Sequence, residues 1–128
     1  DYAFLLYSPH SLCREFYIEC TCNMMRPRTI VDYERIPWIL DAGTVRITFD
    51  SDVRAAIGSY DIFDPGLPAL SVLEPGKLIL EVKFTEMLPQ LLRDVLPPPA
   101  AEFTAVSKYV LCYEKTRYMN GFEYWYET

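Results

Sequence analysis

The sequence lacks several features that would assign it to a well-known class of protein. No apolar run approaches the roughly 20 residues that a membrane-spanning helix needs. The first residues contain neither an initiator methionine nor a secretory signal. No Walker loop, GxGxxG, HExxH or GxSxG motif occurs, so nucleotide binding at a helix N-terminus and hydrolysis by serine or zinc are unsupported. We expect a soluble, cytoplasmic domain that starts inside a longer protein.

Histidine, cysteine and positive charge are also scarce. His10 is the only histidine, and a surface position at the start of a helix explains it more simply than catalysis. The four cysteines, Cys13, Cys20, Cys22 and Cys112, match no zinc pattern and are too few for a disulfide scaffold, so we expect reduced thiols. The formal net charge of −6 argues against a nucleic-acid-binding surface on the chain as a whole.

Helical patterns occur in three places. Residues 8–24 begin with Ser8 as the predicted N-cap and Pro9 at the first helical position. The apolar face of this helix repeats at every fourth position, through Leu12, Phe16 and Cys20. Two shorter helices are predicted over 89–96, before a run of three prolines, and over 104–116.

Strand patterns lie between these helices. Residues 26–40 are rich in β-branched and aromatic residues and end at a turn over 41–43, so they predict one arm of a hairpin. Residues 44–50 alternate strictly between apolar and polar side chains, and residues 77–86 alternate again, with Ile79 on the otherwise polar face. The fold class is therefore α+β, with an antiparallel sheet and flanking helices.

Two segments are less regular. Residues 51–76 are punctuated by glycine and proline, and they predict a short strand near Val53 in an otherwise ordered loop, with Asp61 and Asp64 as turn residues. The aromatic tail, 117–128, contains the turn signal Asn120-Gly121 and predicts a small terminal β-ribbon.

Charged residues fall on one face of the alternating strands: Arg35 before the turn, Arg46 after it, and Glu81 and Lys83 on the later strand. In an open sheet this face would meet water, and the cations would be solubility residues of little energetic weight. In a closed barrel it would line a lumen, where Arg forks and Lys charges hold phosphate oxygens. Glu81 among such cations would be an oxygen ligand for Mg²⁺ or Mn²⁺.

Three segments in this order carry a family resemblance: RPRTIVDYERIPWILDAGTVRITFD, LEPGKLILEVKF and SKYVLC. They resemble, respectively, the paired strands, the metal-binding strand and the closing Ser-Lys-Tyr helix of the vacuolar transporter chaperone (VTC) type polyphosphate polymerase domain, including its bacterial members. The resemblance covers roughly residues 11 to 115. It implies that the sheet is part of a tunnel barrel, in which antiparallel strands close around a triphosphate as in the related CYTH enzymes.

The resemblance also implies residue roles. The implied phosphate ligands are Arg35, Arg46, Arg54, Lys83 and Lys108, with Arg54 the weaker candidate. Glu81 would bind the divalent metal, and Arg35, Arg46 and Lys108 would be catalytic. The implied reaction transfers the γ-phosphoryl group of ATP to a growing polyphosphate chain.

One departure from the family is large. Its members carry an earlier half with one strand that alternates Arg and Lys and another that is rich in Glu and Lys, and neither precedes Tyr2. Residues 1–128 are therefore expected to be a single partial domain, the C-terminal half, inactive or nearly so by itself. Its unpaired strand edges predict self-association, such as a homodimer that completes the sheet.

Three other functions remain open. A triphosphate hydrolase would use the same tunnel, and a non-catalytic sensor would bind polyphosphate or nucleotide without turnover. A structural module would use Arg35, Arg46, Glu81 and Lys83 as ordinary cross-strand ion pairs. The tryptophans and tyrosines are assigned to core and rim positions rather than to base stacking.

Overall fold

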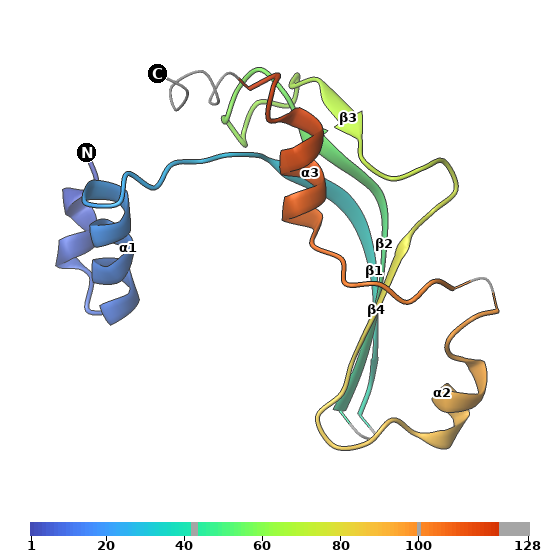
Figure 1. Ribbon diagram of the computed structural model, residues 1–128. Coiled ribbons are helices and arrows are strands. Elements are labelled where there is room, and N and C mark those ends of the chain that lie inside the picture. Colours follow the sequence, from blue (N-terminus) through green and yellow to red (C-terminus); the bar gives the residue numbers. More distant parts are fainter. Residues whose placement is uncertain (42–43, 100, 121–128) are drawn as a thin grey trace.

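The computed structural model describes residues 1–41, 44–99 and 101–120 (Figure 1). The elements in chain order are a 3-10 helix η1 (Ala3–Tyr7), α1 (Ser11–Thr21), β1 (Val31–Leu40), β2 (Val45–Ala56), β3 (Ala69–Ser71), β4 (Ile79–Lys83), α2 (Gln90–Val95) and α3 (Lys108–Thr116). This arrangement confirms the predicted α+β class. No helix among these residues is long and apolar enough to cross a membrane.

The sheet is antiparallel and is built around β2. Strand β1 pairs with one side of β2, while β3 and β4 pair with different parts of its other side. The sheet is open, so closure into a tunnel barrel is not seen within the described residues. Strand β1 has a partner strand on one side only in this part of the chain, and the expected homodimer through a strand edge stays a prediction.

Strand β2 is longer than predicted, because the separate short strand expected near Val53 is its continuation. A bulge joins the two parts: the β1–β2 register shifts between Asp32 and Glu34, and Asp52 adopts a left-handed backbone with φ 48°. One extra residue in β2 reverses which side chains face each side of the sheet. Asp50 before the bulge and Val53 after it therefore share a face.

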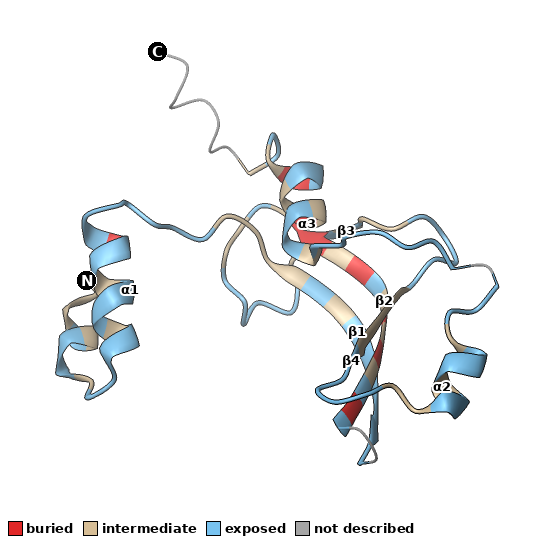
Figure 2. Cartoon of the chain, turned by 60° about the horizontal axis from the view of Figure 1, so that its bottom comes forward, coloured by how far each residue is buried: buried red, intermediate tan, exposed pale blue. Residues whose placement is uncertain are grey.

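Helix α3 covers this shared face. Its Cys112 is buried against Val53 and Ala55, and partly buried residues of β1, β4 and the segment after β3 complete the cluster. Figure 2 shows the buried residues concentrated in β2 and α3. The core is therefore small, and it lies beside the charged residues of the sheet.

The helix ends differ from the prediction. Helix α1 starts at Ser11 with His10 at the N-cap, so Ser8 and Pro9 lie outside it. Helix α3 starts at Lys108, later than residue 104, because the Ser107 hydroxyl caps it by accepting a hydrogen bond from the Val110 N–H at 3.3 Å. Helix α2 lies within the predicted range.

Most of the apolar face of α1 is not covered by the described residues. Leu12 and Phe16 are 71% and 49% exposed, whereas Cys20 is buried. Figure 1 shows α1 standing away from the sheet at the end of an extended segment. The predicted helix is confirmed, and its predicted apolar stripe meets no sheet in this structure.

The turns are confirmed where they are described. The Asp61 and Asp64 carboxylates accept backbone hydrogen bonds from Phe63 and Gly66, as turn residues do. The Thr44 N–H donates to the Asp41 carbonyl at 3.1 Å, which closes the hairpin between β1 and β2. Most of the predicted terminal ribbon, from residue 121 onward, lies outside the described residues.

Candidate functional site

The register of the sheet brings the predicted charged residues to one face. Arg35 lies directly opposite Asp50, Arg46 opposite Lys83, and Thr48 opposite Glu81. Directly opposed residues in an antiparallel pair point to the same side. The face that carries Arg35, Arg46 and Lys83, here called the cationic face, therefore exists as alternation predicted, and Glu81 lies on it.

Asp50 is the centre of this face, although it was not among the predicted site residues. Its carboxylate is fully buried. Arg35 donates to it from Nε at 2.6 Å and from Nη2 at 2.7 Å, and the Lys108 Nζ lies 2.7 Å from its second oxygen. Lys108 comes from the first turn of α3, so the ion cluster joins the helix to both strands.

The two cations hold the pKa of Asp50 well below its ordinary value, at about 2. The hydrogen bonds from Arg35 are the largest cause, and burial opposes them. The Tyr33 ring lies next to both cations, 5.1 Å from the Arg35 guanidinium carbon and 5.2 Å from the Lys108 ammonium. Asp50 therefore remains a carboxylate at any pH near neutrality.

Glu81 and Lys83 form a second pair on the same strand. The Lys83 Nζ lies 3.0 Å from a Glu81 oxygen, and both side chains are partly exposed. The hydrogen bond from Lys83 lowers the pKa of Glu81, with smaller contributions from the charges of Lys83, Lys108 and Arg35. Glu81 is therefore influenced by its own partner Lys83 and also by the two cations that bind Asp50.

Arg46 lies at the far end of the cationic face. It is exposed, and no acidic partner is found for it within the described residues. It lines an open hollow of about 640 Å³ together with Thr44, Val82, Lys83, Phe84 and Thr85. The hydroxyls of two of these residues, Thr44 and Thr85, contact each other. Two cationic and two hydroxyl-bearing residues thus line one open hollow.

Arg54 is separated from these residues. It lies directly opposite Asp32, and its Nη2 is 2.6 Å from the Asp32 carboxylate, while its Nε is 3.5 Å from Asp52. Because Asp32 alternates with Tyr33 and Arg35, this pair is on the other side of the sheet. The structure does not place Arg54 with the other predicted site residues.

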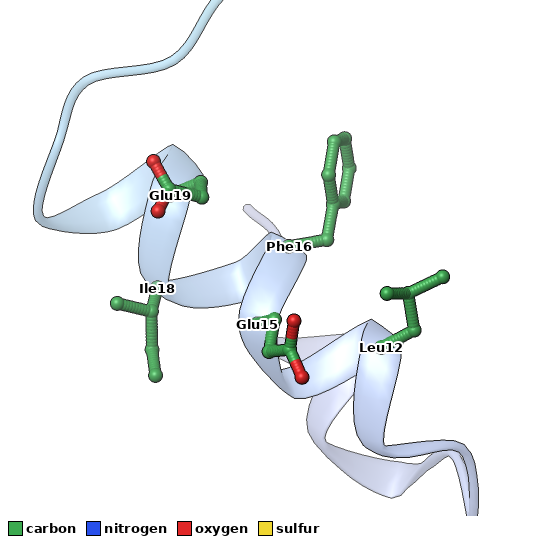
Figure 3. Close-up of a pocket in the computed structure, with 5 residues that line it drawn as sticks. All are labelled: Leu12, Glu15, Phe16, Ile18 and Glu19. Atoms are coloured by element: carbon green, nitrogen blue, oxygen red, sulfur yellow. The ribbon is translucent and has the colours of Figure 1, made fainter.

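A second open hollow, of about 470 Å³, lies on α1 and is lined by Leu12, Glu15, Phe16, Ile18 and Glu19 (Figure 3). Figure 3 shows Leu12 and Phe16 projecting from one side of the helix. The lining is apolar and acidic, with no basic side chain among these residues. This surface does not suit a phosphate ligand.

The donor set for a metal ion is limited. No group of three or more His, Cys, Asp and Glu side chains that could hold an ion occurs in the described ranges. Asp50 is already satisfied by Arg35 and Lys108, which leaves Glu81 as the carboxylate on the cationic face. One carboxylate suits Mg²⁺ or Mn²⁺ when phosphate oxygens and water supply the other ligands.

Comparison with known proteins gives one match. The family model described as VTC domain matches residues 8–117. No curated protein and no solved structure matches the chain. The matched range contains both strands of the hairpin, β4 and α3, and so every residue of the cationic face.

Proposed function

Because this chain belongs to the VTC domain family, whose members are related to polyphosphate polymerases, we propose that its cationic face binds triphosphate and polyphosphate chains. The observation that carries the proposal is the pair formed by Arg46 and Lys83. They lie directly opposite each other on neighbouring strands, and like charges so placed destabilise a sheet. Glu81 offsets part of this repulsion through Lys83, and a polyanion lying across both cations would neutralise the rest.

The spacing along β2 favours a chain of phosphates over a single one. The Arg46–Lys83 row and the Arg35–Asp50 row are four residues apart on β2, which corresponds to about 14 Å in an extended strand. A single phosphate is too small to contact the cations of both rows. A tripolyphosphate or longer chain can contact the cations of both rows, so the proposed ligand class is linear polyphosphate, including the triphosphate of ATP.

The proposed reaction is phosphoryl transfer from ATP to the end of such a chain. A terminal oxygen of the polyphosphate attacks the γ-phosphorus, the bond from that phosphorus to the β–γ bridging oxygen breaks, and ADP leaves. Arg46 and Lys83 would stabilise the negative charge spread over the transferring group. Glu81, with phosphate oxygens, would hold Mn²⁺ or Mg²⁺, which when bound adds positive charge.

Replacing Arg46 with alanine should weaken the binding of tripolyphosphate about tenfold or more, because one charge-assisted contact is lost without loss of a protein partner. Calorimetric titration of the full chain measures this. Arg54→Ala is the matched control, since Arg54 is on the same strand but faces away, and it should leave the affinity unchanged. Equal effects of the two substitutions, or no binding by the unaltered chain, would refute the proposal.

Replacing Glu81 with glutamine should remove the dependence of this binding on Mn²⁺. Without metal, the affinity of Glu81→Gln should rise slightly, because Lys83 loses its carboxylate partner. With Mn²⁺, the unaltered chain should bind more tightly and the variant should not. Glu74→Gln, which breaks a similar exposed pair with Lys77, is the control. An undiminished Mn²⁺ effect in Glu81→Gln would exclude Glu81 as a metal ligand.

A further inference from the structure

In the ion cluster of Asp50, Arg35 and Lys108, here called the Asp50 cluster, the negative charge is buried and the positive charges are partly exposed. The Asp50 side chain is completely buried, whereas the side chains of Arg35 and Lys108 are 33% and 20% exposed. The exposed part of the cluster is therefore cationic. A ligand that approaches the cationic face meets the guanidinium and the ammonium, not the carboxylate.

The contacts of Asp50 also fix how Arg35 presents its donors. A guanidinium has five N–H groups in a rigid planar fork. Asp50 takes one edge of that fork, through Nε and Nη2. The Nη1 edge remains for a second acceptor, and the Tyr33 ring next to the guanidinium limits its movement. The orientation of the fork is thus set before any ligand arrives.

Lys108 is held in the same way. Its ammonium donates toward the second oxygen of Asp50, and the same Tyr33 ring lies 5.2 Å away. Because an ammonium has three donors, this contact leaves others for a phosphate oxygen. The helix itself is fixed on the sheet by the burial of Cys112, so Lys108 has little freedom to leave the cluster.

We propose that Asp50 is a positioning residue of the phosphate site, which aligns Arg35 and Lys108 so that their remaining donors converge on one phosphate group. This inference rests on the proposed binding of polyphosphate by the cationic face. It assigns no direct ligand contact to Asp50, which acts through the two cations.

The direction in which Asp50→Asn changes the affinity for tripolyphosphate distinguishes a positioning role from a purely electrostatic one. Asp50→Asn removes one negative charge from beside two cations, so an electrostatic role predicts tighter binding of tripolyphosphate. A positioning role predicts weaker binding, about tenfold, because asparagine accepts on one atom only and its amide N–H groups oppose the cations. Arg35→Lys keeps the charge but loses the fork, and it should also bind about tenfold more weakly.

The experiment is calorimetric titration of the full chain with tripolyphosphate, at a temperature where circular dichroism shows each variant folded. The double variant Asp50→Asn with Arg35→Lys should lose little more affinity than either single one, because both remove the same alignment. Asp32→Asn, which breaks the Arg54 pair on the other face, should leave the affinity unchanged.

The positioning role would be overturned if Asp50→Asn bound tripolyphosphate as tightly as the unaltered chain or more tightly. If Asp50→Asn does not fold, unchanged binding by Arg35→Lys would overturn it instead. Additive losses in the double variant would also overturn it. Absence of binding by the unaltered chain is a different result, since it would reject the proposed function itself.

Discussion

Lowering the pH from about 5 to below 2 should remove on the order of 2 kcal/mol of folding free energy through Asp50 alone. The pKa of this carboxyl is about 2 in the folded chain, below its ordinary value of 3.8. A lowered folded-state pKa stabilises the fold above the unfolded value, and the stabilisation disappears as pH falls through the folded value. The loss should therefore begin near pH 4 and be complete below pH 2.

Urea unfolding at a series of pH values measures this loss, and Asp50→Asn is its control. The variant should be less stable than the unaltered chain at pH 7 and should lack this part of the acid dependence. Glu74 and Glu81 also have lowered pKa values, but their side chains are 74% and 37% exposed, so they should contribute little. A variant with the same acid dependence as the unaltered chain would show that Asp50 is not stabilised by its partners.

The alternation of strands was enough to predict the cationic face. Side chains in a strand point to opposite sides with period two, so Arg46 with Thr48, and Glu81 with Lys83, had to share sides within their own strands. The hairpin register then places Arg35 on the same side, opposite Asp50. The spacing of apolar residues set these faces, and the structure confirms this placement through the register.

Two residues show what alternation could not supply. Arg54 was assigned with the others, but the bulge at Asp52 turns it to the opposite side, and nothing local in SDVRA indicates a left-handed aspartate. For Asp50, alternation indicates only a polar residue on the same side of its strand as Arg46. Asp50 is buried because Lys108 and α3, which lie far along the chain, pack over it. A contact between segments so far apart in the sequence does not show in the alternation of apolar and polar residues.

The match of the family model carries information that periodicity lacks. Alternation alone left open whether the charged side meets water as a set of ordinary ion pairs. Arg35 does pair across strands with Asp50, whereas Lys83 pairs with Glu81 within β4. Arg46 departs from such pairing, because it faces Lys83 and an open hollow instead. The proposed function therefore depends most directly on Arg46, with Lys83 opposite it.

Reversing both of these charges, with Arg46→Glu and Lys83→Glu together, should abolish binding of tripolyphosphate, with a loss of about a thousandfold or more. Two charge-assisted contacts would each account for about 1.5–3 kcal/mol, and two new carboxylates would repel the ligand. Both side chains are exposed, so the fold and its unfolding midpoint should change little. The measurement is calorimetric titration beside circular dichroism.

The control for this double reversal must carry the same change in net charge, from −6 to −10. Arg14→Glu with Lys115→Glu does so at exposed positions on α1 and α3. If overall charge governed association, both double variants would lose affinity equally, and the loss would disappear at high salt. If the cationic face is the site, the control should bind as the unaltered chain does, because screening at physiological ionic strength, with a Debye length of about 8 Å, isolates distant charges. Substantial binding by the Arg46 and Lys83 reversal would place the polyphosphate elsewhere on the chain.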